Sequence, residues 1–232
     1  MRLDKYLCDT LNFTRSEVKK IISSGRVTLD GAVVRSAAVQ TEEKLVCLDG
    51  QAVAYQEFFY IMLNKPKGYV CANRDSSSKT VFDLLPKDYQ KKDLFVCGRL
   101  DKDTTGLVLL TNNGPLAHRL LAPKKEIFKE YIVGLRDKVS KEDILSLEQG
   151  LVLRDGLHCK PAFFKPLGVR EGIIKISEGK YHQIKRMFAA LQNEVVTLHR
   201  RSIHGLSLDP DLKEGECRYL TSEEIHSLEQ VK

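Results

Sequence analysis

The 232-residue chain lacks several features that would assign it to a class at once. It has no run of about 18 apolar residues, which excludes a membrane-spanning helix. Its first residues have no apolar signal-peptide core. The six cysteines are scattered, without a C-x-x-C pair or a Cys/His set at zinc spacing, so we expect reduced thiols and no bound metal. Together these absences predict a cytoplasmic protein, and the absence of tryptophan excludes nothing.

The composition is that of a folding chain with a modest positive charge. Apolar residues make up 42%, which is too many for a disordered protein. The 37 basic and 31 acidic residues give a formal net charge of +6. This excess suits a polyanionic partner, but it also suits many ordinary enzymes. No glycine-rich phosphate loop opens a helix, and we expect no cofactor.

Residues 1–57 are expected to form a small unit of their own with a short connector. Leucines at every fourth position from Leu3 suggest a first helix. Thr14 and Glu17 match a capping box at the start of a second helix. Asp30 and Gly31 lie between two β-branched runs, a strong hairpin signal. The predicted order is helix, helix, hairpin.

Residues 58–232 are expected to form a second, larger domain. Apolar runs predict strands at 58–63, 107–110, 130–135 and 172–176, and a clear amphipathic helix follows Gly179. Because strands and helices do not alternate strictly, the sequence favours an α+β fold around a largely antiparallel mixed sheet. No heptad or large apolar stripe demands a second copy, so we expect a monomer.

Basic residues gather in the first domain. Arg15 and Lys19 are four positions apart and share one face of the second predicted helix. Residues 1–40 hold seven basic and four acidic side chains. A solvated helix face explains this charge as well as phosphate binding does. The order of the strings 2–7, 14–17 and 25–31, however, resembles the S4 RNA-binding module, and that resemblance implies RNA contacts by Arg15, Ser16, Lys19 and Arg26.

The densest motif is a polar loop, residues 98–106, that runs into a buried strand. It carries two carboxylates, Asp101 and Asp103. Three interpretations are open from the residues alone: a surface turn in which the carboxylates cap backbone N–H groups, a metal loop, or a site in which one side chain is held rigidly for chemistry. A calcium loop would need more alternating oxygen ligands and a distal Glu, and Thr104 to Gly106 do not supply them.

This loop, G-R-L-D-x-x-T-x-G-L-x-L-L-T-N, resembles the signature of the pseudouridine synthases of the small-ribosomal-subunit type. The resemblance implies that Asp101 is the essential residue, whereas Asp103 falls at a variable position. Segments 63–69, 129–131 and 179–188 resemble further motifs of that family in the right order. They imply that Tyr131 lies against the target base and that Lys185 is the basic partner of Asp101. Relatives often carry Arg there, and Lys keeps the charge without the bidentate geometry.

Other residues receive weaker assignments from the same resemblance. The implied substrate contacts are Lys65, Arg99, His182, Ile184 and Arg186. Each also has an ordinary interpretation as a packed or solvated side chain. The cluster at 199–201, His-Arg-Arg, is expected either to hold RNA phosphates or to face water.

The chemistry that the resemblance implies explains these residue types. A carboxylate can attack carbon and later leave, and a nearby cation favours its ionised form. A tyrosine offers a stacking face to a flipped uracil. The strings at 64–71, 103–108 and 177–183 resemble those of the bacterial 16S rRNA enzymes. That resemblance implies 16S rRNA, alone or in a small-subunit assembly intermediate, as the partner and uridine 516 as the target. The same reaction on 23S rRNA, or a non-catalytic assembly factor, are the alternatives.

Overall fold

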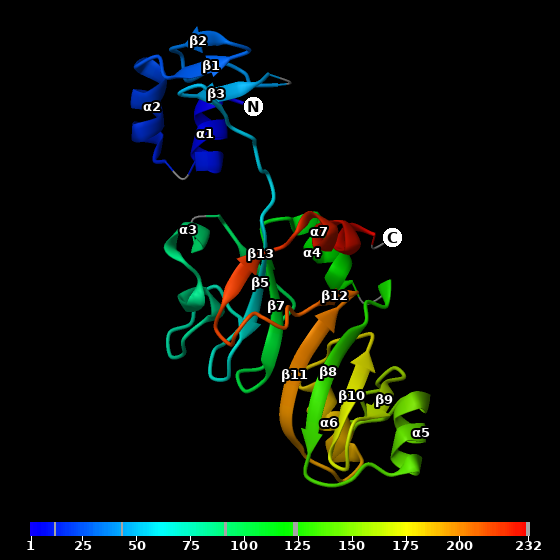
Figure 1. Ribbon diagram of the computed structural model, residues 1–232. Coiled ribbons are helices and arrows are strands. Elements are labelled where there is room, and N and C mark those ends of the chain that lie inside the picture. Colours follow the sequence, from blue (N-terminus) through cyan, green and yellow to red (C-terminus); the bar gives the residue numbers. More distant parts are fainter. Residues whose placement is uncertain (12, 43, 91, 123–124, 231–232) are drawn as a thin grey trace. The chain divides into compact units, whose positions relative to one another are not determined.

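A computed structural model describes residues 1–11, 13–42, 44–90, 92–122 and 125–230. The chain divides into two compact units (Figure 1). The front unit comprises Met1–Phe59 with Lys87–Asp93, and the sheet unit comprises Tyr60–Pro86 with Leu94–Lys232.

The front unit begins with helices α1 (Leu3–Leu11) and α2 (Arg15–Ser23). An antiparallel sheet follows in the order β2-β1-β3-β4. Its strands are β1 (Val27–Leu29), β2 (Ala32–Val34), β3 (Val46–Leu48) and β4 (Gln51–Ala52). The helix-helix-hairpin prediction is confirmed, and β3 and β4 extend the hairpin in a way that the sequence did not indicate.

Local signals explain why these elements start and stop where they do. The Thr14–Glu17 capping box closes reciprocally at the start of α2. Asp30 and Gly31 both take positive φ, 49° and 83°, as a tight hairpin turn requires. One apolar core joins the two helices to the sheet, and its buried members are Leu3, Leu7, Val18, Ile22, Val27, Leu29, Val46 and Val53.

The sheet unit is built on a large sheet with the order β13-β5-β7-β11-β8-β10-β9. In addition, β12 pairs with β11 and β6 with β7. Among the described strands the β7–β11 pair is parallel and the other pairs are antiparallel, which confirms the predicted α+β fold on a largely antiparallel mixed sheet. The strands are β5 (Tyr60–Lys65), β6 (Phe95–Cys97), β7 (Thr105–Thr111), β8 (Lys129–Leu135), β9 (Phe163–Pro166), β10 (Glu171–Ile176), β11 (Val195–Ile203), β12 (Leu206–Ser207) and β13 (Cys217–Tyr219).

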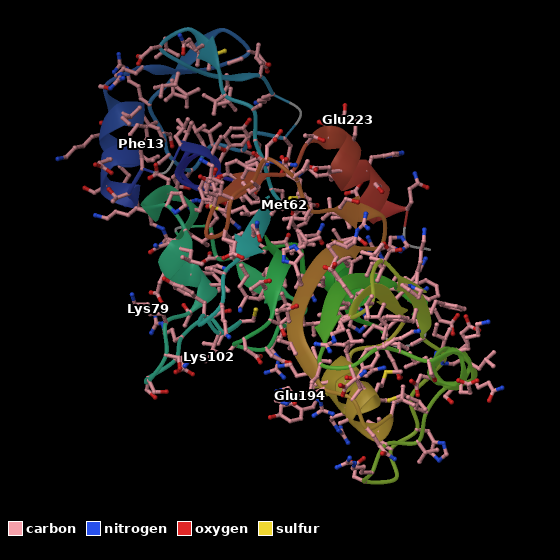
Figure 2. The ribbon with its side chains drawn as sticks, turned by 60° about the horizontal axis from the view of Figure 1, so that its bottom comes forward. Phe13, Met62, Lys79, Lys102, Glu194 and Glu223 are labelled. Atoms are coloured by element: carbon pink, nitrogen blue, oxygen red, sulfur yellow. The ribbon has the colours of Figure 1, made fainter. Side chains whose placement is uncertain are left out.

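Helices and connecting loops complete the sheet unit. The helix that the sequence predicts after Gly179 is α6 (Gln183–Ala190), and it packs against β11 (Figure 1). Fully buried Met62 contrasts with the exposed Lys79 and Lys102 (Figure 2). The other helical segments are η1 (Val81–Leu84), α4 (Gly114–Leu121), α5 (Lys141–Gln149) and α7 (Ser222–Glu229), with α3 (Lys87–Gln90) belonging to the front unit. No helix in the described ranges has the length and apolar character to span a membrane.

Strand β11 was not predicted, and it corrects the interpretation of the basic cluster at 199–201. Arg200 is almost fully buried, and its Nε donates to the Leu107 carbonyl at 2.8 Å. His199 is half-buried, with Nδ1 2.9 Å from the Thr105 hydroxyl, and Arg201 stays exposed. The expectation that all three hold phosphates or face water is therefore wrong for Arg200. A buried arginine on a strand is tolerated here because backbone carbonyls accept hydrogen bonds from its guanidinium group.

Gly106 explains how β7 and β11 can lie so close. Its φ is +101°, and a Cβ there would stand 2.3 Å from the Arg200 carbonyl oxygen. Only glycine fits both the backbone conformation and the close approach. The loop that carries Asp101 therefore enters β7 at a fixed place beside β11.

Candidate active site

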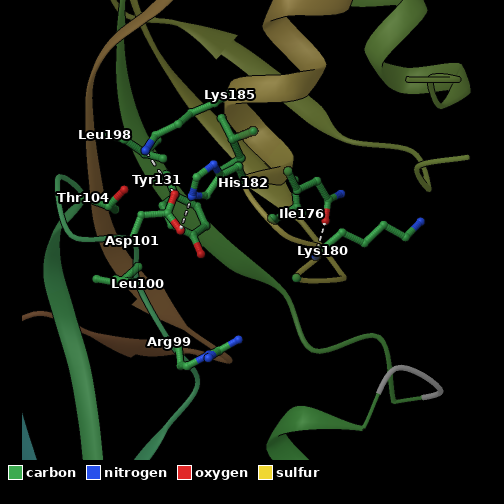
Figure 3. A pocket seen from close by; sticks show the side chains of 13 residues that line it. Arg99, Leu100, Asp101, Thr104, Tyr131, Ile176, Lys180, His182, Lys185 and Leu198 are labelled. Atoms are coloured by element: carbon green, nitrogen blue, oxygen red, sulfur yellow. Dashed lines mark hydrogen bonds and ion pairs between the residues drawn. The ribbon is translucent and has the colours of Figure 1, made fainter. Parts of the chain in front are cut away.

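A pocket opens where the loop before β7 faces the turn that leads into α6 (Figure 3). Strands β8, β10 and β11 contribute one side chain each to its wall. The lining residues are Arg99, Leu100, Asp101, Thr104, Tyr131, Ile176, Gly179, Lys180, His182, Gln183, Ile184, Lys185 and Leu198. The sequence motifs that lie far apart in the chain are thus brought to one place.

The Asp101 loop is fastened from beneath by Lys65. This side chain is 0% exposed, and its Nζ donates to the carbonyls of Thr104 at 2.7 Å and Asp101 at 3.1 Å, with longer bonds to those of Pro66 and Lys102. Burial lowers the pKa of Lys65, and the nearby acidic groups only partly offset that effect. The predicted substrate contact by Lys65 is wrong, because a fully buried ammonium that serves four carbonyls has no surface to offer RNA.

Lys185 bridges two carboxylates. Its Nζ lies 3.1 Å from Asp101 Oδ2 and 2.5 Å from Asp103 Oδ1. Partial burial opposes the charge on Lys185, but the hydrogen bonds to Asp103 and Asp101 outweigh it and raise its pKa. The predicted Lys185–Asp101 pair is present, and the bridge to Asp103 is a feature that the sequence did not reveal.

The two aspartates differ in what they face. The Asp101 side chain is 28% exposed and lines the pocket, whereas that of Asp103 is 57% exposed and lies outside the lining. Partial burial would raise the pKa of Asp103, yet its hydrogen bond to Lys185 and the Lys185 charge hold that pKa below its usual value. One ammonium between two carboxylates leaves the bridge with a net negative charge.

Tyr131 and His182 flank Asp101 (Figure 3). Tyr131 is buried in β8, where its backbone pairs with Arg200 of β11 and Ile174 of β10. His182 Nε2 is 3.6 Å from Asp101 Oδ1, beyond an ordinary hydrogen bond. Both predicted residues therefore lie beside the carboxylate. Tyr131 forms a wall of the pocket, and the partly exposed His182 lies at its mouth.

The remaining predicted contacts separate into two groups. Ile184 is buried under the pocket, and Arg99 lines it while extending away from Asp101 (Figure 3). Arg186 does not reach the pocket. Its guanidinium pairs with Asp155 and donates to the Tyr181 carbonyl at 3.3 Å. Its predicted contact with the substrate is replaced by a bond that holds the turn before α6.

Thr104 and Gln183 are site residues for which the sequence predicted no role. Thr104 is 1% exposed, and its hydroxyl has no hydrogen-bond partner within the described part of the chain. Gln183 is buried and holds the turn, since its side chain accepts from the Lys180 N–H and donates to Glu178, both at 2.9 Å. Both residues lie inside motifs that the sequence identified, but the sequence does not show where their side chains point. Only the packing of the fold shows this.

The predicted RNA contacts of the front unit lie on its surface. Arg15, Ser16 and Lys19 are exposed on α2. Arg26 is exposed too, but its guanidinium is bound to Asp49, with Nη2 2.5 Å from Oδ2. All six cysteines are free thiols, and no cluster of three or more His, Cys, Asp or Glu in the described ranges is arranged to hold a metal.

Comparisons with known proteins agree with this geometry. A family model described as RNA pseudouridylate synthase matches residues 59–190, and the S4 domain model matches residues 1–47. The chain is 44% identical to an uncharacterized RNA pseudouridine synthase of Bacillus subtilis, with 99% of each chain covered. It is 46% and 43% identical to proteins named ribosomal small subunit pseudouridine synthase A from Vibrio vulnificus and Escherichia coli, over 98% of this chain and 99% and 100% of theirs.

A solved structure described as a pseudouridylate synthase is similar over nearly the whole chain. It is 40% identical, with a TM-score of 0.71, over 98% of this chain and 99% of that one. A family model that spans more than half the chain, near-complete coverage by relatives above 40% identity, and a pocket that gathers the motif residues lead to the same assignment. The chain belongs to the RNA pseudouridylate synthase family and is an RNA pseudouridine synthase with an amino-terminal S4 domain.

Proposed function

We propose that this enzyme converts uridine 516 of 16S rRNA to pseudouridine during small-subunit maturation, with Asp101 as the catalytic carboxylate. The proposed catalytic role of Asp101 is supported by its position, because it lines the pocket between Tyr131 and the Lys185 ammonium. The substrate part is supported by relatives above 40% identity that are named small-subunit enzymes.

The reaction conserves every atom of the nucleotide. The bond from the sugar C1′ to N1 of uracil breaks, the base turns, and C1′ joins C5, which then loses its proton while N1 gains one. Attack of Asp101 on C1′, its attack on C6, and assisted elimination all need an ionised carboxylate beside the flipped base. The pocket supplies that group, and the Lys185 ammonium pairs with it at 3.1 Å.

Tyr131 is proposed to hold the base and to take part in the proton loss from C5. Its ring forms the wall beside Asp101 (Figure 3), which places a flat face where a flipped uracil would lie. Ile184 packs below the same space. A flat aromatic wall of this kind suits a planar base, and the Asp101 carboxylate lines the same pocket.

RNA binding beyond the pocket is assigned to residues 1–57, and the chemistry to residues 58–232. The exposed α2 side chains Arg15 and Lys19 suit phosphate contacts, which position an RNA without reading its sequence. Arg26 shares its charge with Asp49, so its contribution to phosphate binding should be smaller. The partner is 16S rRNA or a small-subunit assembly intermediate, and the enzyme is proposed to act as a cytoplasmic monomer.

The substrate is tested by mapping pseudouridines in the rRNA of a strain that lacks this gene. We expect one site, at position 516 of 16S rRNA, to lose its modification and to regain it when the wild-type gene is restored. Loss of a site in 23S rRNA, with 16S rRNA unchanged, would contradict the proposed substrate.

Replacing Lys185 tests the cation beside Asp101. Lys185→Met should lower single-turnover rates at saturating RNA by about 100-fold, because Asp101 loses the cation that pairs with it and the site loses a hydrogen-bond donor. Lys185→Arg keeps the charge and should retain most of the rate. Equal urea midpoints for the three proteins would show that folding is intact, and a Lys185→Met rate near wild type would remove this role.

Substitutions on α2 test the front unit as an RNA contact. Arg15→Gln combined with Lys19→Gln should weaken RNA binding and reduce the slope of log K against log salt by about 1 to 2, because each phosphate contact contributes roughly 0.7 to 0.9. Lys44→Gln removes an exposed charge of the same unit outside α2 and serves as control. An unchanged salt slope in the double variant would remove α2 from the RNA contact.

A further inference from the structure

Tyr181 is the most exposed large hydrophobic side chain among the described residues, at 74%. It stands next to the pocket. Its ring stacks on that of His182, with centroids 3.8 Å apart and planes inclined by 19°. His182 in turn lies 3.6 Å from Asp101. One face of the Tyr181 ring is thus covered by a pocket residue, and the ring remains largely open to solvent.

The turn that presents Tyr181 is held firmly. Arg186 donates to the Tyr181 carbonyl at 3.3 Å and pairs with Asp155. Gln183 fastens the preceding segment through Lys180, whose carbonyl accepts from the Gln183 N–H at 3.1 Å. His182 has a φ of 49°, a left-handed conformation that non-glycine residues rarely adopt. A strained, well-fastened turn that keeps an aromatic ring in water indicates a binding role, because burial of the ring would have been the favourable alternative.

We propose that Tyr181 is a stacking subsite for the base of an unpaired nucleotide adjacent to the target uridine. The inference rests on the proposed function, since it assumes that the target base enters the pocket beside Asp101. A flipped target leaves its neighbours without their stacking partner at the mouth of the pocket. An aromatic ring recovers that stacking for any base, because every base has a π-face.

The surroundings favour RNA over a protein partner. Within the described turn and α6, Tyr181 is the only exposed large hydrophobic side chain. Three cationic side chains belong to the same segment, namely Lys180, Lys185 and Arg186. Lys180 is partly neutralised by Glu178 at 3.0 Å, and Lys185 and Arg186 pair with aspartates. A ring that binds a base next to groups able to approach the backbone is the arrangement found in single-strand binding sites.

Kinetics separate stacking from a structural role of the ring. With total rRNA and immature ribosomal particles from the deletion strain as substrate, Tyr181→Ala should raise the half-saturating RNA concentration by roughly 5- to 100-fold and leave the saturating rate within about threefold. Tyr181→Phe keeps the ring and should match wild type. Tyr181→Leu is apolar without a π-face and should resemble Tyr181→Ala.

A loss of saturating rate alone, with the half-saturating concentration unchanged, would show that the ring only props His182 and would overturn the subsite. Val169→Ala, which truncates a 72% exposed residue outside the pocket lining, is the matched control and should change neither value. Because total rRNA contains both subunits' RNA, this test holds even if the target lies in 23S rRNA. Failure of the substrate proposal therefore stays distinct from failure of the stacking proposal.

Stacking at position 181 can be measured directly by fluorescence, because the chain contains no tryptophan of its own. Tyr181→Trp introduces a single indole that keeps a stacking face. Its fluorescence should be quenched by an RNA fragment containing the uridine that the map identifies. The quench should diminish when the 5′ or the 3′ neighbour of that uridine lacks its base. An equal quench with both neighbours abasic, or none on an RNA that binds, would overturn the proposal.

Discussion

The Lys185 ammonium between Asp101 and Asp103 is the interaction on which the site depends. It joins two segments more than 80 positions apart in the chain, the loop before β7 and the first turn of α6. Because the Lys185 Nζ binds Asp103 at 2.5 Å as well as Asp101 at 3.1 Å, the ammonium is held beside Asp101 from two sides.

Buried cations beneath the site make this placement possible. Lys65 binds the carbonyls of Asp101 and Thr104, and Arg200 binds that of Leu107, so the loop is fastened to the strands on either side of β7. Gly106 allows β7 and β11 to approach closely. Each buried charge costs desolvation, which is offset by its hydrogen bonds to backbone oxygens. The loop that carries Asp101 is thus fastened by buried side chains that lie outside the pocket lining.

Local signals predicted the fold class and the helix-helix-hairpin order, because the capping box and the Asp-Gly turn are local. The S4-like unit and the side chains now found in one pocket, Asp101, Tyr131 and Lys185, followed from the resemblance to known motifs. Sequence patterns failed where the outcome depends on packing between distant segments. Lys65 and Arg200 look like surface cations in the sequence, and only the sheet order reveals that strands bury them. The Asp103–Lys185 bond and the redirected Arg186 are likewise contacts across the fold. From the sequence alone, Tyr181 would be expected to be buried like most aromatic side chains, and only the structure shows that it is exposed.

The assignment of Asp101 as the catalytic carboxylate is tested by measuring single-turnover pseudouridine formation with two variants, Asp101→Asn and Asp103→Asn. Both changes keep side-chain shape and remove one negative charge beside Lys185, but only one removes the carboxylate that faces the pocket. We expect Asp101→Asn to lose at least about 10,000-fold in rate, as loss of a nucleophile does, and Asp103→Asn to stay within about tenfold of wild type. A clearly smaller loss in Asp101→Asn, or an equal loss in both variants, would show that Asp101 is not the catalytic carboxylate.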